Sequence, residues 1–183
     1  MINPLVIDNF FLDFNRVLTH ARTSEFYDWL GPDGEVCKRV NLCRVPTLGD
    51  TLQRMVGNVE ILGAGYRLNY KDELPNHLIH TDVGWGTHAI VVYLNAPNSG
   101  TAFWKHKELG IESLDIPTVE VVEKLELDWE HPSKWEQTAF IEGKPNRAVI
   151  YNSAWFHSRF PFQAAGETRE DGRLVVVAFF NFR

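Results

Sequence analysis

The sequence predicts a mainly β protein with flanking helices, in which the strands form a sandwich or a barrel. Three observations lead to this prediction. From Val59 onward the chain consists of short runs rich in Val, Ile, Tyr and Phe, each bounded by turn residues. These runs do not alternate with helical segments, as the strands of a βαβ protein would. Before Val59, apolar residues instead recur at helical spacing.

The length of the chain favours a single domain. A chain of 183 residues can bury a sizeable core, and 44% of its residues are hydrophobic. We therefore expect one domain over residues 1–183, with a helical support in residues 1–58 and a β core in residues 59–183. The core is expected to carry a charged insert at residues 105–132.

The first expected elements are helices. Residues 8–29 begin with an Asp that can cap a helix and continue with apolar residues at helical spacing. Residues 48–56 are expected to form a second short helix. Within the insert, residues 119–129 are expected to form a third, exposed one. The insert is either a plain surface insertion or a lid over a pocket.

The expected strands follow from the β-rich runs. They are VEILGAGYRLNY (59–70), THAIVVYLN (87–95), TAFWKH (101–106), TAFIEG (138–143), RAVIYNS (147–153) and RLVVVAFFNF (173–182). In the last of these, side chains at 173, 175, 177 and 179 share one face, because side chains alternate along a strand.

Composition narrows the choice of partners and compartment. The net charge of −6, without a dense Lys/Arg stripe, makes nucleic acid a poor candidate. No apolar run is long enough to cross a bilayer, and the first residues lack the features of a signal peptide. We therefore expect a soluble, cytoplasmic protein without a membrane partner. Cys37 and Cys43 fit neither a disulfide framework nor a C-x-x-C site and are expected to be reduced.

His80 and Asp82 form an H-x-D pair, whose side chains share a face on a strand or strand end. Imidazole nitrogen and carboxylate oxygen suit a first-row metal such as iron. A second histidine from a distant strand would complete a 2-His-1-carboxylate face with open positions. The buried strand at 87–95 follows closely and offers rigid support.

His157 is the candidate second histidine, because it follows an apolar strand and lies among aromatic residues. His88, at the start of a strand, is expected to be a core or rim histidine. The segment His106-Lys107-Glu108 also matches the H-x-[DE] spacing, but its charged neighbours predict a solvated turn. The histidines without a comparable setting are His20, His77 and His131.

Residues 66–180 resemble the Fe(II)/2-oxoglutarate-dependent oxygenases, particularly their prolyl-4-hydroxylase-like branch. Six elements stand in the order of that family. They are Tyr70, His80-Thr81-Asp82, Tyr93-Leu94-Asn95, Gly100-Thr101-Ala102-Phe103, His157, and RLVVVAFF from Arg173. The resemblance implies a double-stranded β-helix, which is a jelly-roll or cupin-like barrel.

The resemblance also implies a site. His80, Asp82 and His157 would be the catalytic iron(II) ligands, and Arg173 would bind the distal carboxylate of 2-oxoglutarate. The residues that would line the same co-substrate pocket are Tyr70, Asn95 and Thr101. The implied activity uses dioxygen to hydroxylate a C–H bond of a small molecule or a protein side chain, with decarboxylation of 2-oxoglutarate to succinate.

Two departures from the family leave alternatives open. Val175 stands where the family usually has a serine, and the spacing from His157 to Arg173 is longer than usual, so Arg159 and Arg169 compete with Arg173. The alternative function is a non-catalytic cupin-like barrel that binds a metal or a small ligand. Substrate choice is expected to depend on residues 72–76 and on the insert, and an exposed strand edge would allow a homodimer.

Overall fold

The structure is a computed structural model that describes residues 2–31, 34, 36–73, 78–115 and 117–183. Its strands form two antiparallel sheets, one of seven strands in the order β1-β8-β5-β10-β4-β3-β2 and one of three in the order β7-β6-β9. The strands are β1 (Leu5–Ile7), β2 (Tyr27–Leu30), β3 (Val36–Leu42), β4 (Val59–Asn69), β5 (His88–Asn95), β6 (Gly100–His106), β7 (Trp135–Glu142), β8 (Ala148–Asn152), β9 (His157–Phe160) and β10 (Arg173–Phe182). The helices are α1 (Phe14–Thr23), α2 (Leu48–Val56), α3 (Val119–Asp128) and a 3-10 turn, Pro132–Lys134.

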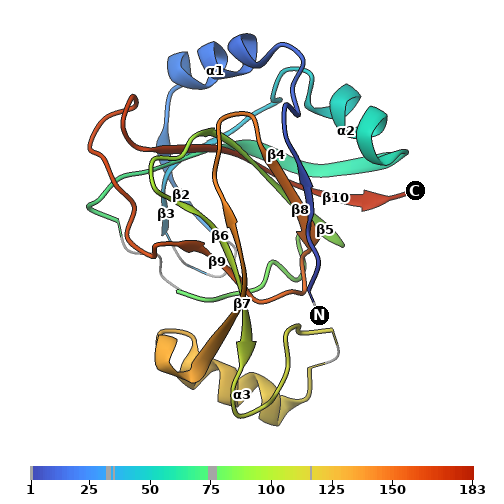
Figure 1. The fold of residues 1–183 in the computed structure, drawn as a ribbon, viewed down its shortest axis with the longest axis vertical. Coiled ribbons are helices and arrows are strands. Elements are labelled where there is room, and N and C mark those ends of the chain that lie inside the picture. Colours follow the sequence, from blue (N-terminus) through green and yellow to red (C-terminus); the bar gives the residue numbers. More distant parts are fainter. Residues whose placement is uncertain (1, 32–33, 35, 74–77, 116) are drawn as a thin grey trace.

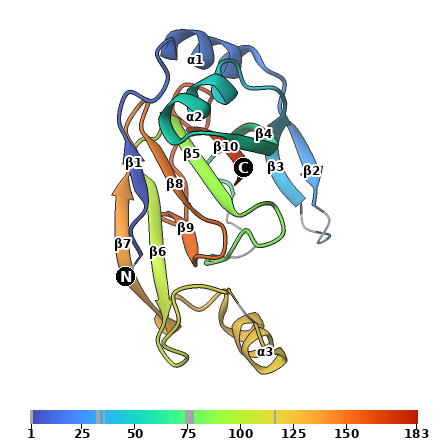
Figure 2. The ribbon, with the colours of Figure 1, turned by 90° about the vertical axis from the view of Figure 1, so that its right-hand side faces the viewer.

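The two sheets enclose the interior of a jelly-roll barrel, and the helices lie outside it. Helices α1 and α2 lie at one end, over the large sheet, whereas α3 lies at the opposite end beyond β6 and β7 (Figures 1 and 2). The predicted fold class, mainly β with flanking helices in a jelly-roll barrel, is confirmed. None of the helices among the described residues combines the length and the apolar character needed to cross a bilayer.

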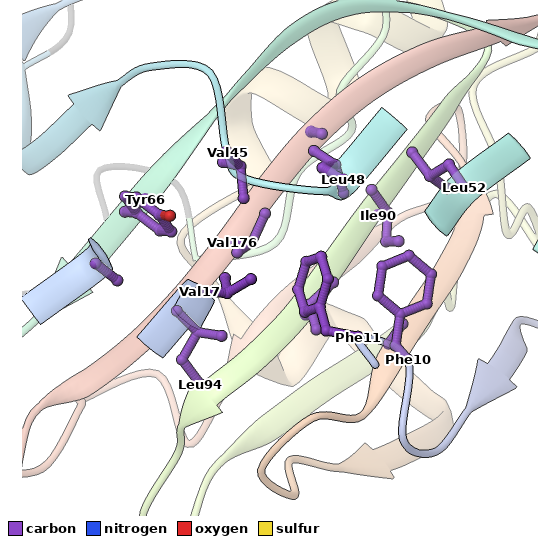
Figure 3. Close-up of a cluster of buried hydrophobic side chains, with 14 of the residues drawn as sticks. Phe10, Phe11, Val17, Val45, Leu48, Leu52, Tyr66, Ile90, Leu94 and Val176 are labelled. Carbon is purple, nitrogen blue, oxygen red and sulfur yellow. The ribbon is translucent and has the colours of Figure 1, made fainter. Parts of the chain in front are cut away.

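Strand β10 separates two cores, because its side chains alternate between the two faces of the sheet. Leu174, Val176, Ala178 and Phe180 join an outer cluster with α1 and α2 (Figure 3). Val175 contributes to a second cluster, between the sheets. Burying a large apolar side chain contributes about 1.5–3 kcal/mol, so both clusters stabilise the barrel. The alternation also directs Arg173 into the barrel interior.

The predicted helix over residues 8–29 is wrong at both ends. Helix α1 begins only after Asp13, whose side chain accepts a hydrogen bond from Arg16 N, and residues 27–30 form a strand. Phe10 and Phe11 are buried without being helical, because Asn146 holds this segment against the core. Its side chain accepts from Phe11 N at 2.8 Å and donates to Phe11 O at 2.9 Å. Residues 1–58 thus contribute strands as well as helices.

The other predicted elements agree closely with the structure. The helices predicted at 48–56 and 119–129 are α2 and α3, and each predicted β-rich run contains a strand. Strand β9 was not predicted, because only three residues separate its start from the end of the preceding predicted strand. It pairs with β6 and brings His157 opposite Phe103.

Candidate active site

The structure brings His80, Asp82 and His157 together at one end of the barrel. His80 and His157 form an isolated antiparallel bridge, and Asp82 N donates to Ser153 O at 2.8 Å. Each of the three side chains offers one ligand atom, and these atoms lie within 4.8 Å of one another. One metal ion can therefore contact all three side chains.

The hydrogen bonds of His157 leave the correct nitrogen for a metal. Its Nδ1 lies 2.9 Å from the carbonyl oxygen of Trp155, so Nδ1 carries the proton and donates. In the neutral ring this leaves Nε2 as a lone-pair donor, and Nε2 lies 3.1 Å from Asp82 Oδ2. A backbone carbonyl that fixes the ring in this way is the usual support of a metal-binding histidine. The donor set of two imidazoles and one carboxylate fits iron(II).

The charges at the three residues favour an ionised carboxylate. Burial raises the pKa of Asp82, but the charge and hydrogen bond of His157 and the charge of His80 outweigh it, so the pKa is lowered. Burial lowers the pKa of His157, but Asp82 outweighs it and the pKa is raised. Asp82 is therefore a carboxylate near neutral pH, which is the form that binds a metal.

Arg173 is a buried cation with spare hydrogen-bond donors. It is 6% exposed and donates from Nη1 to Asn69 Oδ1 at 3.0 Å, and its guanidinium carbon lies 5.7 Å from the centre of the Tyr93 ring. Its Nε has no hydrogen-bond partner among the described residues, and burial lowers its pKa. Because a buried cation needs a counter-charge, the site fits the carboxylate of a bound acid such as 2-oxoglutarate.

Two of the other predicted pocket residues, Thr101 and Asn95, are each connected to Arg173 through one intermediate residue, which is Tyr93 for Thr101 and Gly172 for Asn95. Thr101 is buried, and its hydroxyl lies 2.6 Å from the hydroxyl of Tyr93. Asn95 donates from Nδ2 to Gly172 O at 3.2 Å and also to Glu170 O, so it holds the loop that leads into β10.

Tyr70 does not lie on that face. It packs at the edge of the outer cluster, and the Arg39 guanidinium lies 4.4 Å from its ring centre. In the register of β10 and β4, Arg173 pairs with Asn69, so Asn69 and not Tyr70 shares the face of Arg173. The structure therefore does not bring Tyr70 to the site.

The two competing arginines have different positions. Arg159 lies on β9 opposite Thr101 and donates to the carbonyls of Phe162 and Glu73, each at 2.8 Å. Burial and the charge of Arg173 lower its pKa to about 10. Arg169 instead donates to the carbonyls of Arg22 and Ser24, outside the barrel. Arg159 therefore joins the interior site, whereas Arg169 does not.

Trp85 flanks the H-x-D pair in the sequence, where it could form an apolar wall of the site or simply pack in the core, and in the structure it belongs to a group of stacked aromatic rings. Trp85 follows Asp82, to whose carbonyl it donates from its backbone nitrogen at 3.2 Å. Its ring stacks on Phe179, with centroids 5.6 Å apart, and lies 5.7 Å from that of Trp29. The strand alternation already placed Phe179 on the face of Arg173, whereas Trp29 reaches the wall only through the β2–β3 pairing.

The insert at residues 105–132 contacts the residues that directly precede His80 and His157. Ile79 N, directly before His80, donates to Trp129 O at 3.4 Å, and Phe156, directly before His157, packs with Leu125 of α3. The solvated turn expected at His106 is wrong, because this residue is fully buried. Its charged neighbours suggested exposure, but a partner on α3 satisfies its ring: Nε2 lies 3.0 Å from Asp128 Oδ2.

Not every predicted residue can be placed. His88 begins β5 and stacks on Phe180, as expected for a core or rim histidine. His77 and residues 74–76 of the segment expected to affect substrate choice lie outside the described residues.

Comparisons with known proteins identify a family and a fold. Residues 73–180 match the family described as "Family of unknown function (DUF6445)". No curated protein of similar sequence is found. The structure resembles the non-heme alpha ketoglutarate dependent epimerase SnoN from nogalamycin biosynthesis, with a TM-score of 0.60, 12% identity, and coverage of 98% of this chain and 78% of SnoN.

Two further solved structures share the fold. The carbocyclase SnoK, also non-heme and alpha ketoglutarate dependent, gives a TM-score of 0.58 at 10% identity, with 98% of this chain and 79% of SnoK covered. The apoform of EctD from S. alaskensis gives a TM-score of 0.53 at 13% identity, with 99% of this chain and 73% of EctD covered. At these identities the likeness establishes the fold alone, which this chain shares with SnoN, SnoK and EctD.

Proposed function

The chain belongs to the family of unknown function DUF6445, and on that premise we propose that it is an Fe(II)- and 2-oxoglutarate-dependent oxygenase. One observation carries the proposal. The His80, Asp82 and His157 cluster and Arg173, a buried cation without a carboxylate partner among the described residues, both border the barrel interior, where the Tyr151 ring lies 4.6 Å from that of His157 and within reach of the charge of Arg173. When bound, iron and 2-oxoglutarate would supply the dioxygen-dependent oxidation of a C–H bond, with release of succinate and carbon dioxide.

The protein's own residues hold and orient the reactants. His80, Asp82 and His157 occupy one face of an iron ion and leave the remaining positions open. Arg173 fixes the far end of the co-substrate by pairing its planar guanidinium with a carboxylate, and it keeps its charge at any physiological pH. We also propose that the protein belongs to the prolyl-4-hydroxylase-like branch of this superfamily, that the oxidation ends in hydroxylation, and that the protein is cytoplasmic.

The aromatic rings of Trp85, Phe179 and Trp29 form an apolar surface beside the proposed metal ligands. Trp85 is 40% exposed and stacks on Phe179, which points into the barrel. A substrate that lies against these rings excludes water from the metal ligands, and burial of aromatic surface contributes to its binding. We propose a small molecule or a protein side chain with an apolar portion as the substrate.

Arg173 favours an enzyme over a simple metal-binding barrel. A barrel that only holds a metal needs the three ligands but has no use for a buried guanidinium, which costs free energy to desolvate. A co-substrate with a distal carboxylate provides the missing counter-charge. The same residue therefore supports 2-oxoglutarate as the ligand rather than a neutral molecule.

An anaerobic optical titration tests the proposed function. Metal-free protein receives Fe(II) and then 2-oxoglutarate, in parallel with His80→Ala and with His88→Ala as the matched control outside the cluster. We expect a weak visible charge-transfer band that requires both additions, is absent in His80→Ala and persists in His88→Ala. Iron binding without a band on adding 2-oxoglutarate would instead identify a metal-binding barrel.

A further inference from the structure

Arg159 and Arg173 are two interior cations without a carboxylate partner. Arg173 donates to the side-chain amide of Asn69, and Arg159 donates to two backbone carbonyls. Neither forms an ion pair with a described residue, whereas Arg67 pairs with Glu73. Both retain N–H groups for a further acceptor, because a guanidinium has about five donors.

The sheet register brings these two arginines to one cluster. Arg159 on β9 stands opposite Thr101 on β6, and such cross-strand pairs have Cβ atoms about 4.5–5.5 Å apart. The Thr101 hydroxyl lies 2.6 Å from that of Tyr93, and the Tyr93 ring lies 5.7 Å from the Arg173 guanidinium. Two guanidiniums and two hydroxyls thus border the same part of the interior.

The charges of this cluster call for an anion. The two arginines are close enough for the charge of Arg173 to act on Arg159. Glu73, a buried carboxylate whose charge also acts on Arg159, already accepts hydrogen bonds from Arg39 and Arg67. A carboxylate entering between Arg159 and Arg173 would relieve their repulsion and satisfy their free donors.

We propose that Arg159 is a second co-substrate-binding residue, which forms with Arg173 a two-arginine clamp on the distal carboxylate of 2-oxoglutarate. This inference rests on the proposed function. It explains how the site can dispense with the serine of related enzymes, since Val175 offers no hydrogen bond at that place. The hydroxyls of Tyr93 and Thr101 complete the cradle. Arg159 thereby gains a role beyond fastening the loops at Phe162 and Glu73.

The test isolates the contribution of the distal carboxylate. Binding of 2-oxoglutarate and of 2-oxopentanoate, which has the same length but no distal carboxylate, is measured by calorimetry on manganese(II)-loaded protein, where no turnover occurs. The ratio of the two affinities reports on the carboxylate contacts alone. In Arg159→Gln we expect this ratio to fall about 10- to 100-fold, the effect of losing hydrogen bonds to a charged group.

Matched variants separate the clamp from a structural role. Glutamine keeps an amide that can donate to the carbonyls that Arg159 holds, so thermal unfolding of Arg159→Gln should stay close to that of the wild type. Arg159→Lys keeps the charge and should recover part of the ratio, whereas Arg169→Gln, outside the barrel, should leave it unchanged. If Arg159→Gln does not fold, Arg159→Lys alone tests the clamp. Lysine lacks the planar guanidinium, so the ratio of the affinities for 2-oxoglutarate and 2-oxopentanoate must still be lower than in the wild type.

The outcomes distinguish the inference from the proposed function. A wild-type protein that binds both acids equally contradicts the carboxylate anchor and with it the proposed function. A wild-type protein that prefers 2-oxoglutarate, together with an unchanged ratio in Arg159→Gln and Arg159→Lys, overturns only the clamp. That second result would leave Arg159 as a loop-fastening residue.

Discussion

His80 and His157 exchange two backbone hydrogen bonds, of 3.0 and 2.9 Å, which place their rings 4.6 Å apart. The two residues are 77 positions apart in the chain, yet the backbone alone fixes their relative position. Asp82 is held in the same manner by its bond to Ser153 O. The metal centre is therefore preorganised, so removing one ligand side chain should disturb metal binding more than folding.

Replacement of Asp82 tests this preorganisation. Asp82→Ala leaves the two backbone bonds of His80 and His157 intact but removes the only carboxylate of the three-residue cluster. We expect iron content, measured by elemental analysis after reconstitution, to fall to background while the circular dichroism spectrum is unchanged. Asp50→Ala, at an exposed position in α2, should retain its iron. Retention of full iron content by Asp82→Ala would rule out this carboxylate as a ligand.

Replacement of Arg173 should weaken co-substrate binding without weakening the fold. Arg173→Met removes a buried cation that has no carboxylate partner among the described residues, so the metal-free variant should unfold at the wild-type temperature or above it. Its affinity for 2-oxoglutarate should fall about 10- to 100-fold, with iron binding retained. Arg183→Met, at an exposed position directly after the end of β10, is the control. A marked drop in melting temperature would show instead that Arg173 stabilises the barrel.

Replacement of Asn146 should destabilise the N-terminal segment. This residue makes two hydrogen bonds to the backbone of Phe11 and is 8% exposed. Asn146→Ala leaves two buried backbone groups without partners, and we expect a loss of about 2–4 kcal/mol in the free energy of unfolding. Asn98→Ala is matched, because Asn98 also has a positive φ but is exposed. Its cost should stay near the backbone strain of about 1 kcal/mol, as measured by denaturant titration.

Asn146 also shows where sequence reasoning reached its limit. The helical spacing of Phe10, Phe11 and Phe14 correctly indicated buried side chains, but the first two are held against the core by Asn146, which lies 135 positions beyond Phe11. No local pattern contains that information. The strands, in contrast, were predicted well, because β-branched and aromatic runs bounded by turns are a local property.

The candidate site shows the same division. Period-two alternation placed Arg173, Val175 and Phe179 on one face, and the H-x-D pair with His157 marked three residues that the structure brings together. Tyr70 was chosen from its place in a motif, and the register of β4 against β10 puts Asn69 on that face instead. A shift of one residue reverses the face of a side chain, and the sequence does not specify register to that accuracy.

The buried pair of His106 and Asp128 leads to a prediction about how stability depends on pH. Its Nδ1 accepts a hydrogen bond from Leu109 N at 3.1 Å, so the neutral ring carries its proton on Nε2 and donates it to Asp128. Lys124 binds the same carboxylate at 3.1 Å. Burial raises the pKa of Asp128, but these partners outweigh it and the pKa is lowered. The ionised carboxylate therefore stabilises the attachment of α3 to β6.

The sign of the pH dependence follows from the lowered pKa. The contribution of Asp128 is fully present above its ordinary value of about 3.9 and is lost as the pH falls through the lower value of the folded protein. We expect Asp128→Asn to lose about 1–2 kcal/mol of stability at pH 7, and this difference from the wild type should shrink between about pH 4 and pH 2. Thermal unfolding of both proteins across this range checks it. If the stability difference between the wild type and Asp128→Asn stays constant with pH, then packing of the Asp128 side chain, and not its charge, attaches α3 to β6.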